Sequence, residues 1–330
     1  MSGSEVFDLC REAAVSDELW KLASVRLRGD SVDRLADVSL SIGHGVTAIV
    51  GFSGAGKTSL LNVLAGMDTP DAGTVDGPLL QAGDARLPVY WSPQDGGLWP
   101  HLSVREHLEV VQPEDFANSA DKLLADFDLA ERANALPGQM SRGELSRLGV
   151  ARCLAARPAV MLMDEPLAHT DPARRPAWWQ AIRNAVRATE CSLVFSTHEP
   201  EAAVAESTSI VCLENGTVVF KGATRDLYHQ PPTLELGQFL GAVNWFDEEA
   251  TAIWLNPAAE LSGPVGLRPE RLEIIPDEGG QFTVSSFSFF GSFAETTLNF
   301  TCDSTTHERT ILTRQCEELC PLQRVRLNLK

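Results

Sequence analysis

The sequence predicts an α/β domain with a mostly parallel sheet, followed by a small all-β domain. Strand-like and helix-like segments alternate from about residue 19 to residue 213, as they do where helices cover both faces of a parallel sheet. Near Gly241 the segments become short and rich in strand formers, with turn residues between them. A length of 330 residues also favours two domains. We therefore expect one domain over residues 1–240 and a second over residues 241–330.

The first domain begins with three strand-like segments and a helix. The third strand is an apolar run that ends directly on Gly51, so a buried strand leads into a glycine-rich loop. The helix after this loop carries apolar residues at helical spacing and is closed by Gly66. The expected strands cover residues 22–27, 38–42 and 46–50, and the expected helix covers residues 57–67.

Strands and helices continue to alternate through the rest of the first domain, and helical patterns dominate residues 100–157, where we expect a helical subdomain. The second domain contains short strands typical of a small barrel or sandwich. The remaining strands of the first domain are expected at 88–92, 159–163, 192–195 and 208–213, and the helices between 104 and 129 and at 141–156, 173–188 and 200–206. The strands of the second domain are expected at 252–255, 265–268, 272–275, 282–289, 294–300 and 325–329.

The charge and the termini exclude several classes of function. A formal net charge of −18 disfavours nonspecific binding to nucleic acid or to anionic lipid, because such a surface repels phosphate groups. The N-terminus carries charged residues where a signal peptide needs an apolar run, and no apolar stretch approaches the ~20 residues of a membrane span. We therefore expect no nucleic-acid partner and a chain that neither spans nor crosses a membrane.

The cysteines indicate a reducing compartment. Their number is odd, they are scattered, and they lack the paired spacing of a zinc site or of a disulfide framework. Cys316 and Cys320 could meet on one helix face, but unpaired thiols are the simpler interpretation. The seven cysteines are Cys10, Cys153, Cys191, Cys212, Cys302, Cys316 and Cys320.

The loop from Gly51 to Thr58 carries a complete G-x-x-x-x-G-K-[ST] pattern between a buried strand and a helix. Glycines let the backbone wrap phosphates with its N–H groups pointing inward, and the helix N-terminus adds positive potential. Lys57 is expected to reach the β- and γ-phosphates, and Thr58 to ligate Mg²⁺. A glycine-rich turn that binds nothing is the alternative. The expected phosphate-binding residues are Gly51, Ser53, Gly54, Ala55, Gly56, Lys57, Thr58 and Ser59.

A second acidic element follows about a hundred residues later. The apolar run 160–163 ends in Asp164 and Glu165. At the carboxyl end of a parallel strand these side chains are expected to emerge beside the phosphate loop, where ligands bind in such sheets. Asp164 suits Mg²⁺, and Glu165 suits the polarisation of an attacking water. Many strands end in Asp, so these two acids indicate a nucleotide site only in combination with the glycine-rich loop.

Further motifs point to a family. Met140-Ser141-Arg142-Gly143-Glu144 resembles the L-S-G-G-Q signature that separates ABC ATPases from other P-loop enzymes. Gln94, followed by Leu98 to Leu102, resembles the Q-loop of that family. Pro166 to Asp171 resembles its D-loop, and Ser196-Thr197-His198-Glu199 resembles the segment with its switch histidine. The chain is therefore similar to ABC ATPases in five motifs that occur in the family's order.

The resemblance implies a head-to-tail dimer that binds ATP and Mg²⁺ between one subunit's phosphate loop and the other subunit's signature. Ser141 and Gly143 would hold the γ-phosphate from across the interface, and Asp171 would also belong to the nucleotide site. The resemblance further implies that His198 contacts the γ-phosphate. Gln94 would sense Mg²⁺ and the attacking water, while its loop touches a membrane subunit.

Three positions depart from the family pattern. Arg142 stands where glycine is usual and adds charge beside the phosphate site, whereas Glu144 in place of glutamine is a familiar variation. The aromatic residue expected to stack on adenine is replaced by Arg28, whose guanidinium plane can also stack on a base. Trp20 is an alternative for the same position.

The residues beyond about 227 resemble the small β-domain, of TOBE type, that is appended to importer ATPases. This resemblance rests on short runs such as Gly266-Leu267-Arg268-Pro269-Glu270 and 289–293. It implies an ATPase at the cytoplasmic face of the inner membrane, with permease subunits and indirectly a solute-binding protein as partners. The solute is expected to be an inorganic ion, such as molybdate, sulfate or ferric iron. A purely structural or dimerising β-domain and a ligand-sensing one both remain open.

Two other functions are compatible with the motifs. In a regulatory nucleotide switch outside transport, Arg142 would have slowed hydrolysis. An exporter ATPase is disfavoured because the β-domain is typical of importers. Turnover in the presence of the membrane partners separates the switch from the transporter.

Overall fold

The computed structural model describes residues 18–78, 86–113, 119–255, 263–302, 305–314 and 317–330. The chain divides into two compact units, Met1–Gly222 and Ala223–Lys330. Each unit has its own hydrophobic core. The domain boundary expected near residue 240 stays a prediction.

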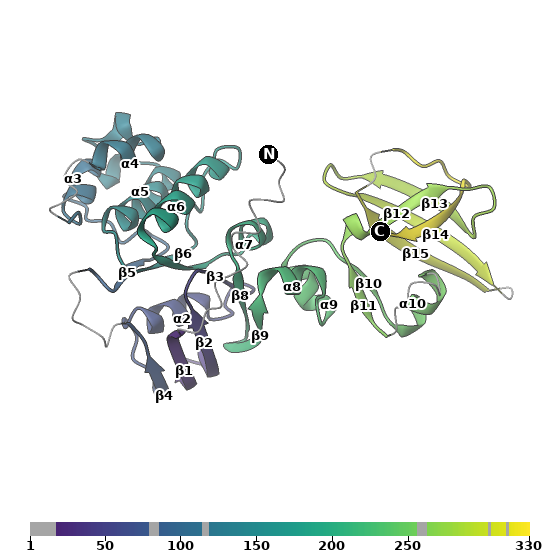
Figure 1. Ribbon diagram of the computed structural model, residues 1–330, viewed down its shortest axis with the longest axis horizontal. Coiled ribbons are helices and arrows are strands. Elements are labelled where there is room, and N and C mark those ends of the chain that lie inside the picture. Colours follow the sequence, from purple (N-terminus) through teal and green to yellow (C-terminus); the bar gives the residue numbers. More distant parts are fainter. Residues whose placement is uncertain (1–17, 79–85, 114–118, 256–262, 303–304, 315–316) are drawn as a thin grey trace. The chain divides into compact units, whose positions relative to one another are not determined.

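A three-stranded antiparallel sheet opens the N-terminal unit (Figure 1). Its order is β2-β1-β4, and Leu22 in the central strand pairs with Leu40 on one side and Val75 on the other. Buried and exposed residues alternate along much of β1, which buries Trp20 and Leu22 in the core. The strands are β1 Glu18–Leu27, β2 Leu35–Gly43 and β4 Ala72–Asp76, of which β4 has no counterpart among the predicted strands.

A six-stranded sheet forms the centre of the same unit, and its order is β5-β6-β7-β3-β8-β9. The pairs β5·β6, β6·β7, β7·β3 and β3·β8 are parallel, which confirms the predicted fold class. Strands β6 and β7 are buried along their whole length, as expected for near-continuous apolar runs covered on both faces. The strands are β3 Val46–Val50, β5 Val89–Ser92, β6 Val160–Asp164, β7 Ser192–Ser196, β8 Ser209–Glu214 and β9 Thr217–Ala223.

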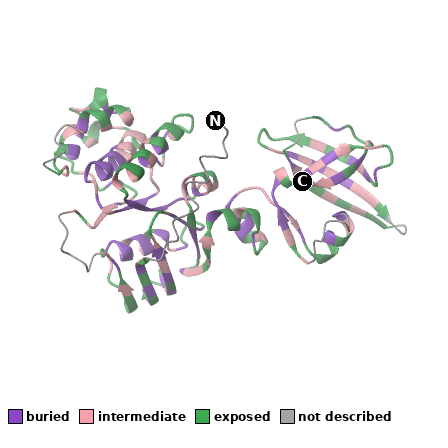
Figure 2. Ribbon diagram, viewed as in Figure 1, coloured by how far each residue is buried: buried purple, intermediate pink, exposed green. Residues whose placement is uncertain are grey.

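Helices cover the central sheet and form a separate helical group. Figure 2 shows α2 and the central strands largely buried; Ile49, Leu60 and Leu162 belong to one core. The group α3, α4 and α5 lies within the segment where a helical subdomain is expected (Figure 1). The helices are α2 Lys57–Leu64, α3 Val104–Glu109, α4 Ala120–Asp126, α5 Arg142–Ala155, α6 Arg175–Thr189 and α7 Pro200–Glu206, with 3-10 turns at Ala130–Arg132 and Pro137–Gln139.

The C-terminal unit is built on a five-stranded antiparallel sheet of order β12-β16-β13-β14-β15, with a two-stranded sheet of β10 and β11. Its core includes Trp254 stacked on Phe282, with ring centroids 5.1 Å apart. The strands are β10 Asn244–Phe246, β11 Val265–Leu267, β12 Leu272–Pro276, β13 Phe282–Phe289, β14 Ala294–Cys302, β15 Thr305–Thr313 and β16 Arg324–Leu329. The helices are α8 Thr224–His229, α9 Leu234–Phe239 and α10 Glu248–Trp254, and a 3-10 turn covers Pro269–Arg271.

One predicted strand is wrong. Residues 252–255 lie at the end of helix α10 and just beyond it. Asp247 caps this helix, because its carboxylate accepts the Ala250 N–H at 2.8 Å, and two glutamates follow in the first turn. Ala250 and Trp254, four residues apart, are both buried on one face. The cap and this helical spacing override the strand propensity of the short apolar run.

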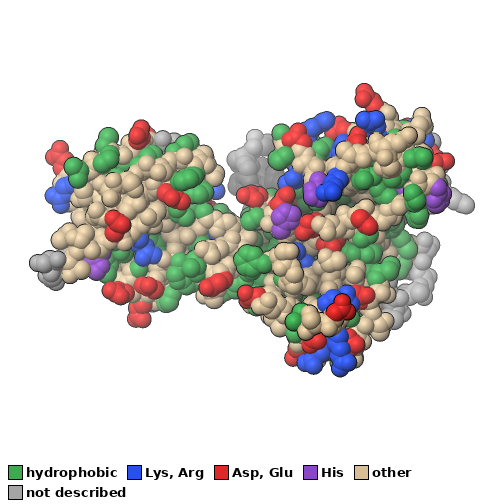
Figure 3. Space-filling model, turned by 180° about the vertical axis from the view of Figure 1, so that it is seen from behind, with side chains coloured by type: hydrophobic (Ala, Val, Ile, Leu, Met, Phe, Trp, Pro, Cys, Tyr) green, Lys and Arg blue, Asp and Glu red, His purple; other side chains and the backbone are tan. Residues whose placement is uncertain are grey.

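None of the helices in the described part of the chain is long and apolar enough to cross a membrane. Acidic side chains are spread over both units on the face drawn in Figure 3, with basic side chains between them.

Candidate functional site

The loop between β3 and α2 depends on two glycines. Gly56 has a φ of +101°, and a Cβ there would lie 2.6 Å from the carbonyl oxygen of Arg34. A Cβ on Gly51 would lie 2.3 Å from the carbonyl oxygen of Leu213. Both contacts are too short for any real Cβ, so these positions need glycine. The loop is therefore pressed against neighbouring backbone and has a defined shape.

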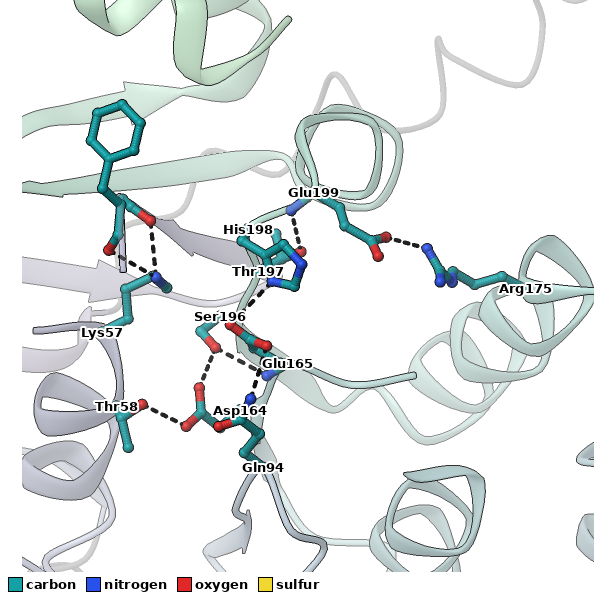
Figure 4. Close-up of polar contacts among 12 residues, drawn as sticks. Lys57, Thr58, Gln94, Asp164, Glu165, Arg175, Ser196, Thr197, His198 and Glu199 are labelled. Atoms are coloured by element: carbon teal, nitrogen blue, oxygen red, sulfur yellow. Dashed lines mark hydrogen bonds and ion pairs between the residues drawn. The ribbon is translucent and has the colours of Figure 1, made fainter. Parts of the chain in front are cut away.

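Lys57 is the first residue of α2 and is 8% exposed. Its ammonium donates to the carbonyl oxygens of Gly51 at 2.9 Å and Phe52 at 3.2 Å. These bonds curl the side chain back over the loop (Figure 4). A buried ammonium at a helix N-terminus provides the positive potential that a phosphate needs.

Thr58 and Asp164 meet beside the loop. The Thr58 hydroxyl donates to Asp164 Oδ2 at 2.7 Å, which links α2 to the end of β6. The Ser196 hydroxyl, at the end of β7, donates to Asp164 Oδ1. Asp164 is 4% exposed and Ser196 is fully buried, so the two bonds fix the carboxylate (Figure 4).

Glu165 extends the same network. Its carboxylate accepts from Gln94 Nε2 at 3.0 Å and contacts His198 Nδ1 at 3.2 Å, so both side chains orient it (Figure 4). Its backbone N–H donates to Ser196 Oγ at 3.0 Å. Glu165 has a φ of +49°, a left-handed conformation that is uncommon for a residue with a Cβ. The bend separates the direction of its side chain from that of Asp164.

The phosphate loop, Gln94, Glu165 and His198 border one cavity of about 680 Å³. It is lined by Val32, Asp33, Arg34, Ser53, Gly54, Ala55, Gly56, Lys57, Thr58, Ser59, Gln94, Glu165 and His198. The structure thus brings the phosphate loop together with Gln94, Glu165 and His198, and Asp164 reaches the loop through Thr58. Their roles in binding and catalysis stay predictions.

The donor set fits a magnesium ion. The Thr58 hydroxyl, the Asp164 carboxylate and the Gln94 amide offer oxygen ligands, which Mg²⁺ prefers. Among the described residues no group of three or more His, Cys, Asp and Glu side chains could hold a metal. The Thr58 hydroxyl and the Asp164 carboxylate, 2.7 Å apart, suit an ion held by one carboxylate together with ligand phosphates and water, as is usual for Mg²⁺.

The signature residues lie outside the cavity lining. Ser141 caps α5 by accepting the Glu144 N–H at 3.3 Å, and the Glu144 carboxylate accepts the Ser141 N–H at 2.8 Å. This second bond and those from the Ser141 hydroxyl and Arg132 lower the pKa of Glu144. The glutamate is therefore suited to the capping box as an anion. Arg142 is exposed in the first turn of α5.

Two further predicted residues also lie outside the cavity lining. Arg28 is exposed, and its backbone N–H donates to Asp71 Oδ2 at 2.7 Å. The cavity wall nearest in sequence consists of residues 32–34 instead. The alternative residue, Trp20, is 1% exposed in the core and cannot stack on a base. Asp171 turns its carboxylate to the Ala173 N–H at 3.0 Å.

The sequence analysis missed the residues that hold the loop after Gln94. Arg152, near the end of α5, donates to the carbonyl oxygens of Gly96 at 2.7 Å and Gly97 at 2.9 Å. Its guanidinium also lies 4.5 Å from the Trp99 ring centroid. Arg152 is 3% exposed, and no motif reveals a buried arginine of this kind. The loop is thereby attached to the helix that begins at the signature.

Arg175 is a second residue that the motifs did not reveal. It begins α6 and pairs with Glu199 (Figure 4). Its other nitrogens donate to Thr170. Only its position four residues after Asp171 could have suggested that it lies near the site.

Comparison with known proteins agrees with this geometry. The family model described as ABC transporter matches residues 35–168. The Fe(3+) ions import ATP-binding protein FbpC of Pseudomonas fluorescens is 31% identical over 284 residues, which is 78% of this chain and 79% of that protein. The Molybdenum import ATP-binding protein ModC of Paramagnetospirillum magneticum is 33% identical over 228 residues, covering 63% of this chain and 62% of that protein.

Solved structures of ATP-binding cassettes also align with this chain. A dimeric ATP-binding cassette in a post-hydrolysis state, bound to ADP and Pi, aligns with a TM-score of 0.56 and 25% identity over 62% of this chain and 99% of that one. An ATP-binding subunit of an ABC transporter, 23% identical, aligns with a TM-score of 0.57 over 63% of this chain and 91% of that one, and supports the fold. The chain is an ATPase that belongs to the family of ABC transporter ATP-binding proteins.

Proposed function

We propose that this chain is the ATP-hydrolysing subunit of an ABC importer that takes up an inorganic ion, such as ferric iron or an oxyanion like molybdate or sulfate. The observation that carries the proposal is the Glu165 carboxylate, held between Gln94 and His198 beside the Thr58–Asp164 pair. In this proposal Glu165 is the base, Gln94 and His198 orient it, and Thr58 and Asp164 bind the metal beside the phosphate loop.

Each side chain has a role in hydrolysis. Lys57 binds the β- and γ-phosphates, and the loop N–H groups surround them. Mg²⁺, held by Thr58, Asp164 and Gln94, would neutralise phosphate charge. Glu165 accepts a proton from the attacking water, whose oxygen forms the new bond to the γ-phosphorus while the bond to the β–γ bridging oxygen breaks and ADP leaves. Gln94 and His198 keep the carboxylate in place for that transfer.

Transport requires partners. Ser141, Gly143 and Asp171 lie outside this chain's cavity lining, which supports their use at the site of a second copy in a head-to-tail dimer. The dimer would act on permease subunits at the cytoplasmic face of the inner membrane, with a solute-binding protein delivering the ion. The relatives' names, which include Fe(3+) and molybdenum import, support the direction and the solute class.

Replacing Glu165 tests the mechanism. Glu165→Gln keeps the shape of the side chain but removes the base, so ATP binding should persist while hydrolysis falls by about 10²–10⁴-fold. The measurements are nucleotide affinity and steady-state turnover in the complex with the permease. Glu201→Gln, an exposed glutamate of α7, is the control and should hydrolyse ATP like the wild type. Unchanged turnover in Glu165→Gln would reject the assigned base.

Uptake assays test the solute. Proteoliposomes containing the complete importer should accumulate ferric iron or an oxyanion only with ATP at the face that binds this chain. Wild-type turnover without accumulation of either ion class would reject the proposed solute but leave the hydrolytic mechanism intact.

A further inference from the structure

We propose that Arg175 is a positioning residue that ties the D-loop (166–171) to the switch loop (196–199) and so holds His198 against Glu165. The inference rests on the proposed function, since it concerns how His198 and Glu165 are kept in register. The D-loop follows β6 and Glu165, and the switch loop begins at the last residue of β7. A side chain that contacts both loops can therefore set the distance between them.

Arg175 contacts both loops with one guanidinium group. Nη1 pairs with the Glu199 carboxylate. Nη2 donates to the Thr170 carbonyl oxygen at 3.1 Å, and Nε donates to the Thr170 hydroxyl at 3.3 Å. The Arg175 side chain is 18% exposed. Because the guanidinium is planar and its donors are fixed, moving either loop would break contacts with the other.

The D-loop end of this connection is ordered by Thr170. This residue is 7% exposed, and its hydroxyl donates to the Leu167 carbonyl oxygen at 2.5 Å. The same hydroxyl accepts from Arg175, so it is used as donor and acceptor at once. Leu167 and His169 have φ values of +64° and +59°, and the loop begins directly after Glu165. Thr170 is therefore tied to the backbone segment that follows Glu165, the proposed base.

The switch-loop end leads to His198. The Glu199 N–H donates to the Thr197 hydroxyl at 3.0 Å, and the Thr197 N–H donates to the Ile49 carbonyl oxygen at 3.1 Å. His198 stands between these two residues and contacts Glu165 (Figure 4). Its side chain is 60% exposed, so few neighbours other than Glu165 restrain it. A contact that holds Glu199 therefore also restrains the imidazole of the neighbouring His198.

A second ion pair shows that Arg175 is not needed merely to join two helices. Arg183 of α6 pairs through Nη1 with the Glu206 carboxylate of α7 at 2.6 Å. This pair joins α6 directly to α7, whereas Arg175 joins α6 to Glu199 of the switch loop, which precedes α7. It provides a control in which an α6–α7 ion pair is lost and the loops keep their contacts.

A double-mutant cycle tests the proposal in the complex with the permease. Arg175→Ala should lower kcat about 10- to 100-fold, because a misplaced catalytic group has that order of effect, while the KM for ATP stays within about twofold. In a His198→Ala background, single-turnover rates should fall by less than about twofold on adding Arg175→Ala, since the two residues act through one group. Arg175→Lys should restore part of the activity, because it keeps a charge for Glu199 but loses the two bonds to Thr170.

Two further variants separate a role in positioning from a loss of folding. Thr170→Val removes only hydroxyl contacts, so it should lower kcat in the same direction even if Arg175→Ala does not fold. Arg183→Ala should keep kcat within about twofold of the wild type. The inference would be overturned if Arg175→Ala lowered the rate equally in the presence and absence of His198, or if it left kcat unchanged. In either case an active wild-type complex would still uphold the proposed function. A wild-type complex without turnover would overturn both.

Discussion

At the scale of single residues, close backbone approaches decide where glycine must stand. Gly51 and Gly56 fix the shape of the phosphate loop, and Gly143 lets the start of α5 approach the D-loop. A Cβ on Gly143 would lie 2.8 Å from the carbonyl oxygen of His169. Gly143, which belongs to the signature motif, is therefore also needed for close packing within one chain.

Gly143→Ala should displace the D-loop. The new methyl group meets a backbone oxygen that cannot swing aside, so we expect a loss of about 1–3 kcal/mol in the free energy of unfolding. The measurement is chemical denaturation of the purified chain. Gly138→Ala is the matched control, because a Cβ there meets nothing within 4 Å. Equal stability of the two variants would show that the D-loop yields to the methyl group without cost.

At this scale, several residues that the motifs single out line one cavity. Lys57, Gln94, Glu165 and His198 lie together at the cavity, because each ends or follows a parallel strand and those ends meet at one edge of the sheet. Arg152 escaped prediction because its partners are backbone oxygens distant in sequence, and Arg175 because it joins the nearby Thr170 to the distant Glu199 carboxylate. Such partners leave no local pattern.

At the scale of elements, helix α5 connects two parts of the site. It begins at Ser141, and Arg152 near its other end holds the loop that follows Gln94. The same loop is held by His107 of α3, whose Nε2 accepts the Trp99 N–H at 2.9 Å, while Nδ1 lies 2.7 Å from the Ser103 carbonyl oxygen. These two partners require a neutral imidazole with its proton on Nδ1.

The neutral His107 should make stability depend on pH. Burial, with the nearby Arg152 charge, lowers its pKa from the ordinary 6.5. Well above pH 6.5 the imidazole is neutral in the folded and unfolded chains alike. As pH falls below 6.5 the unfolded chain gains a proton first, so the free energy of unfolding falls, by at most about 1.4 kcal/mol per pH unit, until the folded-state pKa is passed.

Thermal unfolding from pH 7.5 to 5.0 measures this effect against His107→Asn, which cannot titrate. The stability advantage of the wild type over that variant should shrink as the pH falls. His101→Asn, at an exposed position, should follow the wild type. A difference between wild type and His107→Asn that does not change with pH would contradict the lowered pKa of His107.

Prediction of elements succeeded where periodicity and burial agree. The buried parallel strands β3, β6 and β7 were predicted from apolar runs that end at a glycine, an acid or a serine. Strand β15 was not predicted, because its sequence, rich in threonine and charge, contributes few buried residues and is defined by nine pairings with β14. Residues 252–255 were assigned to a strand because the cap at Asp247 was overlooked.

At the scale of the whole molecule, two hydrophobic cores are separate. Leu162 belongs to the core of the N-terminal unit, and Leu298 to that of the C-terminal unit. Both side chains are fully buried. Because each unit has its own core, it meets the main requirement for folding as an independent domain.

Calorimetry should therefore resolve two unfolding transitions. Leu298→Ala removes buried apolar atoms from one core and should destabilise that unit by about 2–5 kcal/mol, which moves one transition only. Leu162→Ala should move the other transition. A single transition that both substitutions shift equally would mean that the units unfold together.

The left-handed residues after β6 lower the stability of a segment that includes the proposed base. Glu165, Leu167 and His169 have φ values of +49°, +64° and +59°, each costing about 1–2 kcal/mol that glycine would avoid. Yet glycine in place of Glu165 would abolish the carboxylate. The segment is therefore less stable than it would be with glycine at these positions, and attempts to engineer a more thermostable protein should leave Glu165 untouched.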